Sequence, residues 1–250
     1  MHATRNTEKS MVIRIATIAV LWSGAVAAGA AGRGQAEEAV SLAKAALMPY
    51  RTAHAYRGAR TTTFVFGKEE NRLTMTTAIQ ARADDRGAIT RLRAQTTSWG
   101  DAKSKEIAGT EDRLLTYDGK TVWIYYPDTG RYRRDVRKPS DLPTLLSLPP
   151  VEAAWTFAPR TREDEPGERA VRASIEGEEW TLALDSTGHL RRLVRVSGKG
   201  AGRIVATTTL RDLAFDTAAD LPDERYAFHP PVGATEDRTI VAQEGRPLLP

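Results

Sequence analysis

The chain has 250 residues, of which 41% are hydrophobic and 27% are charged, and this suits one large β domain or two small domains with enough apolar material for a core. It contains no cysteine, which excludes disulfides, thiolate catalysis and metal sites with cysteine ligands. The net charge is +4, but four of the basic residues and one acidic residue lie within residues 1–36, so the rest of the chain is nearly neutral and nucleic-acid binding is not indicated.

Residues 1–36 have the layout of a secretory signal peptide. Arg5, Lys9 and Arg14 make the start basic, and an apolar stretch follows over residues 15–31. Small residues then offer cleavage sites between about residues 28 and 36. The alternative is a membrane anchor, but the stretch is short and rich in Ala and Gly, which favours cleavage over a permanent span. We therefore expect an exported, periplasmic protein whose signal peptide is cleaved.

Residues 37–53 are expected to form a helix. Apolar residues recur here at three- and four-residue spacing, namely Ala39, Leu42, Ala43, Ala46 and Leu47. Glu37 and Glu38 suit the N-terminal end, where the helix dipole favours negative charge. Pro49 makes the second half less favourable for a helix.

From residue 56 onward the pattern is that of short strands separated by turns. Eleven segments are predicted as strands: 61–66, 73–79, 89–97, 114–117, 121–126, 131–136, 155–159, 170–175, 179–184, 190–196 and 203–210. Asp118-Gly119 is a strong hairpin signal between two of them. The spacing of the turns predicts a mainly β fold, with about ten or eleven strands in a single curved antiparallel sheet that forms a half-open β-barrel. No internal repeat or interdomain linker is evident.

The segment at residues 141–150 interrupts this pattern. It is apolar, bounded by prolines and without alternation, and it carries Leu142, Leu145, Leu146 and Leu148. Four leucines so close together would expose an apolar patch unless they cover something, so we expect a short helical lid on the sheet.

One face of the sheet is expected to be apolar, because Trp180, Leu182 and Leu184 share a parity. The helix at 37–53 and the lid are the elements that could cover this face. Two small elements do not fill a curved sheet, so an apolar cavity is expected beneath them.

Two motifs resemble a known group of proteins. Residues 114–128 read Leu-Leu-Thr-Tyr-Asp-Gly-Lys-Thr-Val-Trp-Ile-Tyr-Tyr-Pro-Asp, and residues 221–234 end in Phe-His-Pro-Pro-Val-Gly-Ala. In this order they resemble the hairpin and the closing signature of the LolA-like and LolB-like periplasmic lipoprotein-carrier superfamily, including its predicted periplasmic protein branch. The resemblance covers residues 37–240, and residues 241–250 are expected to be a flexible tail. It implies an incomplete β-barrel with a helical lid over an apolar cavity, and a role in carrying lipoproteins or sensing lipids between two membranes.

These features predict a non-enzymatic carrier or sensor that binds lipid or lipoprotein acyl chains. The candidate residues of the cavity are Trp123, Tyr125, Leu142, Leu145, Leu146, Leu148, Trp155, Phe157, Trp180 and Leu182. For Trp123 and Trp155, burial in the core is the alternative to lining the cavity. The alternative function is a non-catalytic regulatory module that docks a protein partner on the concave sheet. Envelope proteins of the inner or outer membrane are then the expected partners, and any membrane contact is transient.

No catalytic, cofactor or metal site is predicted. His54, His189 and His229 are not at metal-ligand spacing, and the sequence has none of the motifs of nucleophilic or nucleotide-binding sites. Basic clusters over residues 131–138 and 191–195 fit either a solvated strand face or an anionic partner such as a lipid headgroup.

Overall fold

The computed structural model describes residues 34–67, 71–100, 112–135, 137–150, 152–159, 166–216 and 221–238. A helix covers residues 34–52, in agreement with the predicted one. The predicted signal peptide lies outside the described residues up to residue 33, and so does the predicted tail at 241–250. Within the described ranges, no helix combines the length and the apolar character needed to cross a membrane.

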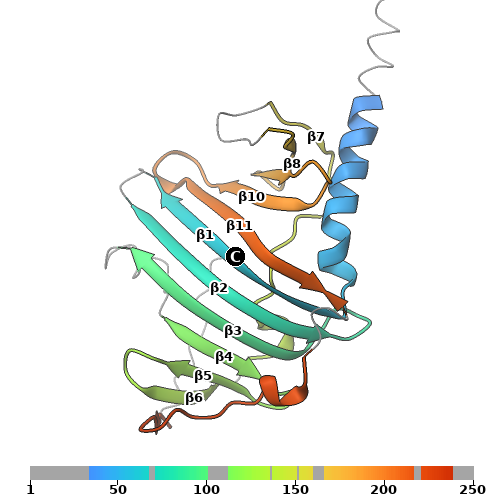
Figure 1. Cartoon of the computed structure of the whole chain (residues 1–250). Helices are drawn as coiled ribbons and strands as arrows, with labels where there is room; N and C mark the ends of the chain where they lie inside the picture. Colours follow the sequence, from blue (N-terminus) through green and yellow to red (C-terminus); the bar gives the residue numbers. More distant parts are fainter. Residues whose placement is uncertain are drawn as a thin grey trace, which may run out of the picture.

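The described strands form one curved sheet (Figure 1). They are β1 (Ala55–Phe66), β2 (Arg72–Ala83), β3 (Ile89–Gly100), β4 (Arg113–Tyr117), β5 (Val122–Tyr126), β6 (Arg131–Asp135), β7 (Thr156–Phe157), β8 (Arg169–Ile175), β9 (Glu178–Leu184), β10 (Leu190–Ser197), β11 (Ile204–Phe215) and β12 (Thr235–Glu236). Their order is β12-β6-β5-β4-β3-β2-β1-β11-β10-β9-β8-β7. Two meanders, β1 to β6 and β7 to β11, therefore join at the β1–β11 pair. The predicted mainly β, half-open architecture is confirmed.

One pair of strands departs from the antiparallel arrangement. β12 pairs with β6 in parallel and has only two residues. The sequence does not predict this strand, because two residues are too few to show an alternation of side chains.

The longest strands lie at the centre of the sheet and are bent at a β-bulge. β1, β2, β3 and β11 have 12 residues each. The register between β1 and β11 shifts between Arg57 and Ala59. A Cβ atom at the intervening Gly58 would lie 2.7 Å from Leu213 Cδ2 and 3.2 Å from the Arg211 backbone oxygen, so a larger residue here would require the Leu213 side chain to shift. The bulge helps to curve the sheet around its inner face.

Hydrogen-bonded turns connect the shorter strands, as the sequence predicts. The Asp118 carboxylate accepts hydrogen bonds from the backbone N–H groups of Lys120 (2.9 Å) and Thr121 (2.8 Å). Gly119 between them has a φ of +92°, which favours glycine. In the β9–β10 turn, Asp185 accepts hydrogen bonds from the backbone N–H groups of Thr187 and His189 in the same way.

The inner face of the sheet carries two large apolar clusters. The first joins the helix to β8–β11, and its buried members are Ala39, Ala43, Ala46, Leu47, Leu146, Trp155, Val171, Ala173, Trp180, Leu182, Leu184, Leu190, Leu193 and Leu210. The second lies on the other half of the sheet, and its buried members are Tyr56, Ile79, Ala81, Ile89, Leu92, Ala94, Leu115, Tyr117, Val122, Ile124, Leu142 and Leu145. The apolar stripe of the helix and the shared parity of Trp180, Leu182 and Leu184 are thereby confirmed.

The leucine-rich segment crosses between the two clusters without forming a helix. A single 3-10 turn, η1 (Pro139–Asp141), precedes it, and residues 142–150 have no regular secondary structure. Pro143 and the Pro149-Pro150 pair explain this, because proline lacks an N–H donor and restricts the residue before it to extended conformations. The lid is therefore a strap rather than the short helix that the sequence predicts. We call residues 142–148 the strap.

Candidate functional site: a cavity beneath the strap

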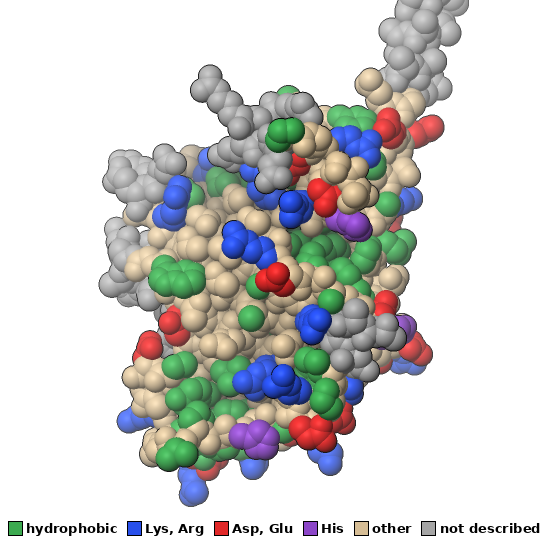
Figure 2. Space-filling model, in the orientation of Figure 1, with side chains coloured by type: hydrophobic (Ala, Val, Ile, Leu, Met, Phe, Trp, Pro, Cys, Tyr) green, Lys and Arg blue, Asp and Glu red, His purple; other side chains and the backbone are tan. Residues whose placement is uncertain are grey.

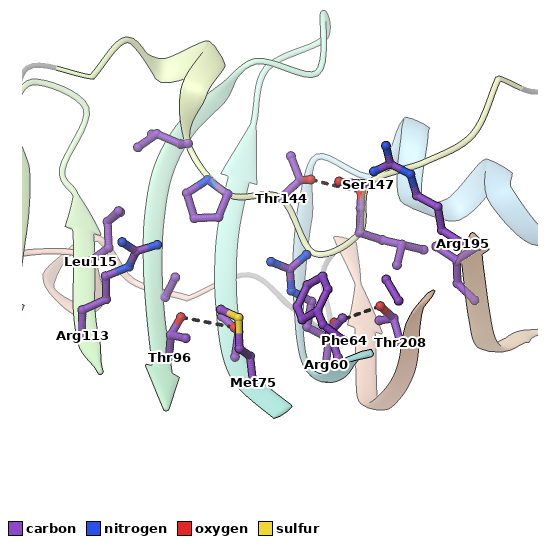
Figure 3. A pocket seen from close by; sticks show the side chains of 18 of the residues that line it. Arg60, Phe64, Met75, Thr96, Arg113, Leu115, Thr144, Ser147, Arg195 and Thr208 are labelled. Atoms are coloured by element: carbon purple, nitrogen blue, oxygen red, sulfur yellow. Dashed lines mark hydrogen bonds between the residues drawn. The ribbon is translucent and has the colours of Figure 1, made fainter. Parts of the chain in front are cut away.

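A cavity of about 230 Å³ lies between the inner face of the sheet and the strap (Figure 3). The strands supply most of its wall, and residues 141–147 supply the rest. The lining residues are Arg60, Thr62, Phe64, Met75, Thr77, Ala94, Thr96, Arg113, Leu115, Asp141, Leu142, Pro143, Thr144, Leu146, Ser147, Trp180, Leu193, Arg195, Ala206 and Thr208.

The register of the central strands places these side chains in rows across the sheet. One row runs Leu210, Arg60, Thr77, Thr96, Arg113 from β11 to β4. The next runs Leu193, Thr208, Thr62, Met75 from β10 to β2. A third runs Trp180, Arg195, Ala206, Phe64 from β9 to β1. Alternation along each strand therefore brings polar and apolar side chains together on the inner face.

Four threonines form a polar belt across the floor of the cavity. The hydroxyls of Thr62 and Thr208 lie 2.9 Å apart, and those of Thr77 and Thr96 lie 3.2 Å apart. All four residues are buried. Each hydroxyl thus has a partner, which removes most of the cost of placing it away from water, and we call these four residues the threonine belt.

Arg60 projects from the floor toward the strap (Figure 3). Its Nη1 donates a hydrogen bond of 3.4 Å to the backbone oxygen of Leu145. Burial lowers the pKa of the guanidinium from its usual value, and the neighbouring Tyr56 raises it again in part. Burial likewise raises the pKa of Tyr56 to about 12, so the phenol stays neutral at physiological pH.

Arg195 has a carboxylate partner in the same wall. Its Nε lies 2.8 Å from Glu178 Oε2 and its Nη2 lies 2.5 Å from Glu178 Oε1, a bidentate ion pair. The guanidinium also lies over the Trp180 ring, 5.1 Å from its centroid. Arg113 is the third cationic residue of the lining, and Asp141 is the acidic one. The cavity is more polar and more cationic than the sequence predicts.

The structure places three of the candidate residues in this lining. Leu142 and Leu146 reach it from the strap, and Trp180 reaches it from β9. Leu145 lies beside it in the second apolar cluster, at a smaller recess of about 60 Å³.

Four further candidates lie in or against the first apolar cluster and not in the lining. Trp155 and Leu182 are 1% and 0% exposed, so both are core residues. Leu148 and Phe157 are partly buried and pack against the same cluster. The same cluster contains the lining residues Leu146, Trp180 and Leu193, so these four residues pack beside the cavity.

Trp123 and Tyr125 lie on the outer face of β5. Their neighbours Val122 and Ile124 are buried in the second cluster, so the alternation of the strand turns both aromatic rings outward. The Trp123 ring stacks on Phe228 with centroids 5.4 Å apart. The two sequence motifs therefore meet here, on the side of the sheet that faces away from the cavity.

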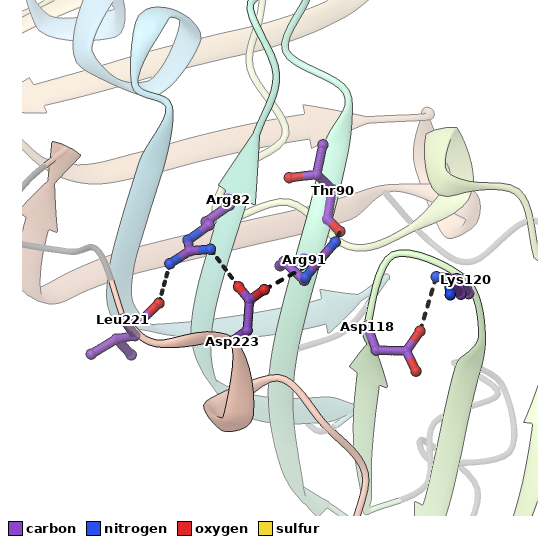
Figure 4. Close-up of polar contacts among 7 residues, drawn as sticks. All are labelled: Arg82, Thr90, Arg91, Asp118, Lys120, Leu221 and Asp223. Atoms are coloured by element: carbon purple, nitrogen blue, oxygen red, sulfur yellow. Dashed lines mark hydrogen bonds and ion pairs between the residues drawn. The ribbon is translucent and has the colours of Figure 1, made fainter.

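The segment that carries the closing motif is fastened to the outside of the sheet by an arginine pair (Figure 4). Asp223 Oδ1 lies 2.6 Å from Arg82 Nη1, and Asp223 Oδ2 lies 3.5 Å from Arg91 Nη2. Arg82 also donates to the Leu221 carbonyl and lies over the ring of the fully buried Tyr226. This cluster has a structural explanation, because it holds the last described segment in place.

The outer face of the central strands, which faces away from the cavity, differs from the inner face. In Figure 2 much of its middle is neither charged nor hydrophobic. Threonines account for part of this surface, and Thr61 and Thr63 are hydrogen-bonded to Thr76 and Thr74 across β1 and β2. Trp99, at the end of β3, is 57% exposed.

Sequence reasoning missed the polar half of the site. Arg60 and the threonine belt stand in segments where threonine occupies both parities, such as Thr61-Thr62-Thr63, so no alternation indicates which side chains turn inward. The signal that could have found them is pairing: once β1 is aligned with β11, Thr62 faces Thr208. Among the described residues, no group of three or more His, Asp or Glu could hold a metal ion.

No family model and no curated protein matches the chain. A chain of the Pseudomonas aeruginosa MucA/MucB complex is similar over 76% of this chain and 61% of its own length, at 14% identity and a TM-score of 0.39. A LolA superfamily protein from Nitrosomonas europaea is similar over 76% of this chain and 97% of its own, at 9% identity and a TM-score of 0.36. A DUF1329 family protein from Desulfovibrio piger is similar over 77% of this chain and 97% of its own, at 12% identity and a TM-score of 0.30.

The second of these structures carries the name of the superfamily that the two sequence motifs resemble. The present chain spans less than two thirds of the first. Because all three TM-scores are below 0.5, the function of the chain has to be argued from its own cavity.

Proposed function

We propose that the protein is a non-enzymatic periplasmic carrier or sensor, which holds the acyl chains of a lipid or lipoprotein in the cavity beneath the strap. The observation that carries this proposal is a cavity on the inner face of a half-open sheet, closed by a segment without regular secondary structure. Binding of this kind needs no chemical step and no cofactor. The resemblance of the two sequence motifs points to the same class of protein.

The contacts that hold the strap favour its displacement by a ligand. Three of its leucines are buried, but they divide between two clusters: Leu146 packs in the first, and Leu142 and Leu145 pack in the second. Its polar attachments to the described residues of the sheet are few, and the bond from Arg60 to the Leu145 carbonyl is long at 3.4 Å. A segment held by side-chain contacts rather than by a hydrogen-bond ladder opens at low cost.

The size of the cavity favours such a movement. At about 230 Å³ it lies below the roughly 300–1,000 Å³ of typical small-molecule pockets. An acyl chain that enters would replace the leucines of the strap and bury its own methylenes, each worth about 0.8 kcal/mol. Burial of a few methylene groups of the acyl chain would then compensate for the contacts that the strap loses.

Substitutions in the strap test this proposal. We expect Leu146→Asp to weaken binding of a fluorescent acyl-chain probe at least tenfold, because the aspartate would bury a charge or hold the strap away from the sheet. Leu145→Asp should act in the same direction. Arg134→Ala is the control, since Arg134 is exposed on β6 and lies over Trp123 on the outer face. Circular dichroism should show that each variant keeps its strands. If folded Leu145 and Leu146 variants bind the probe like the parent, the strap does not cover the binding site.

Capture from the periplasm separates the carrier from the alternative function. The protein is pulled down and the material that comes with it is extracted for lipid. Enriched lipid supports the proposal. An enriched protein without lipid would contradict it and would favour a regulatory module that docks a partner on the concave sheet.

Export is tested separately. A fusion of residues 1–40 to a reporter should reach the periplasm and lose its N-terminal residues. Detection of an intact Met1 on the mature protein by mass spectrometry would contradict the proposed location.

A further inference from the structure

Arg60 is a partly buried cationic group in the wall of the cavity. It occupies the middle of the row that runs from Leu210 to Arg113, flanked by Leu210 on β11 and Thr77 on β2. These two neighbours carry no charge. In the described part of the chain, no carboxylate lies within ion-pair distance of the Arg60 guanidinium.

The contrast with Arg195 shows what Arg60 lacks. Both arginines line the same cavity, but Arg195 makes two short bonds to Glu178. Arg60 has one hydrogen bond within the described residues, at 3.4 Å to Leu145, which is longer than the usual 2.7–3.2 Å. A guanidinium has five N–H donors, so most of the hydrogen-bonding capacity of Arg60 remains for a ligand. Arg60 is partly buried, and a charge withdrawn in part from water is costly unless an anion compensates it.

The surroundings of Arg60 suit a molecule with two chemical parts. Phe64, Leu115 and Leu146 line the cavity with apolar surface. Thr62 and Thr77 offer hydroxyls beside the guanidinium, each already paired with a neighbouring threonine. The threonine belt can therefore lie against the polar group of a ligand without needing a hydrogen bond from it.

We propose that the ligand of this cavity is an anionic amphiphile, whose carboxylate or phosphate binds Arg60 while its hydrocarbon chain lies under the strap. This inference rests on the proposed function and adds the headgroup chemistry to it. A neutral acyl chain would leave the guanidinium covered and unpaired, whereas an anion would give it a charge-assisted, bidentate partner. The cavity should thus select among chains of equal length by the charge at their end.

A pair of probes with the same chain tests the selection. Decanoate and 1-decanol are titrated against a neutral naphthylamine dye bound to the purified protein at pH 8, where the acid is ionised. Decanoate should displace the dye at a concentration about tenfold lower than decanol does. Inorganic phosphate is titrated in parallel as an anion without a chain, and it should displace nothing in this range.

Substitution of Arg60 then assigns the selection to one side chain. Arg60→Met keeps an unbranched chain of similar reach without the charge, so it should remove the preference for decanoate and leave decanol binding within about twofold. Arg60→Lys keeps the charge and should keep most of the preference. Arg57→Met is the matched control, because Arg57 lies on the same strand and is exposed. It should bind both probes like the parent.

The outcomes separate this inference from the function on which it rests. If neither probe displaces the dye from the parent protein, the proposed function fails. If both displace it equally, or if Arg60→Met still prefers decanoate, the chain site stands but recognition of an anion by Arg60 is overturned. Displacement by phosphate alone would also overturn it, because the site would then recognise an anion without a chain. The comparison of the two probes on the parent protein needs no variant, so selection for an anion is tested even if Arg60→Met misfolds, and Arg60→Lys then tests the assignment to Arg60.

Discussion

The flanks and the centre of the inner face are built from different side chains. On the flank under the helix, Val171, Leu182 and Leu184 are all 0% exposed, and on the other flank Leu92 and Ile124 are as well. At the centre, the same face carries the threonine belt, with Arg60 beside it. The comparison indicates that the flanks supply most of the stability of the fold. The centre does not need to be apolar for the sheet to form, so it is free to serve a ligand.

The covering elements explain why the two regions differ. The helix packs mainly on the β8–β11 side, although Tyr50 near its end also packs against the second cluster, and Leu142 and Leu145 pack on the opposite side. Neither fills the space between them, which is where the cavity lies. Apolar packing of the two clusters on either side of the cavity holds the cavity open.

The largest expected effect comes from truncation in a flank. Leu182 is 0% exposed and packs among leucines and Trp180. We expect Leu182→Ala to lower the free energy of unfolding by about 2–5 kcal/mol, because the cavity it leaves has rigid neighbours on every side. Chemical denaturation followed by circular dichroism measures this. A loss below about 1 kcal/mol would mean that the flank is not the stabilising region.

The same substitution in the strap should cost less. Leu146 is also buried, at 5% exposure, but one side of it borders the existing cavity. Truncation there removes fewer contacts, so we expect Leu146→Ala to lower the free energy of unfolding by about 1–2 kcal/mol. The same denaturation experiment applies. A loss equal to that of Leu182→Ala would show that the strap is an integral part of the core and is not readily displaced.

The threonine belt should respond to paired and single changes in opposite ways. Thr208→Val leaves the buried Thr62 hydroxyl without its partner and should cost about 1 kcal/mol. The double change Thr62→Val with Thr208→Val removes both hydroxyls and should be nearly neutral. Thr61→Val is the control, since its partner Thr76 lies on the outer face and is only partly buried. Thermal unfolding measures these losses of stability. A double variant that loses as much stability as the two single variants together would contradict the pairing of the hydroxyls.

The flanks could be predicted from the sequence, and the centre could not, for a physical reason. In the flank, Trp180, Leu182 and Leu184 alternate with Thr181 and Ala183, so one parity is clearly the larger and more apolar. In β5 all of Val122 to Tyr126 is apolar or aromatic, so alternation does not decide which parity turns inward. Trp123 and Tyr125 are candidate cavity residues by sequence, whereas in the structure Val122 and Ile124 face the core. Their orientation follows from the register of the whole sheet, which depends on pairings far apart along the chain.

The strap shows the same division between local and distant information. Its prolines and leucines predict a covering segment, and this is what the structure contains. Its contact with Arg60 joins residues 85 positions apart, and nothing near either residue indicates it. Local turn chemistry, by contrast, was predictable, because Asp118-Gly119 carries its own hydrogen-bond acceptor and its own permissive backbone.

The smallest expected effect concerns that turn, which joins β4 and β5 in the flank away from the helix. Burial tends to raise the pKa of Asp118, but hydrogen bonds from Thr121 and Lys120 and the nearby Arg91 outweigh it, and the pKa lies below its ordinary value of 3.8. The folded state therefore favours the ionised carboxylate. This contribution to stability is present above the ordinary pKa and is lost as the pH falls through the lowered, folded-state pKa.

Asp118→Asn isolates this contribution, because the amide oxygen can accept the same hydrogen bonds but does not titrate. We expect the parent to exceed the variant in free energy of unfolding at pH 7, and the difference to shrink by pH 2. The change should stay below about 1 kcal/mol, since the group is partly exposed and screened by solvent. Asp128→Asn, in the next turn, is the control, because the Asp128 side chain accepts no hydrogen bond from the described residues. A difference that is constant with pH, or equal for the two variants, would show that the turn is held by its backbone conformation and not by the charge of Asp118.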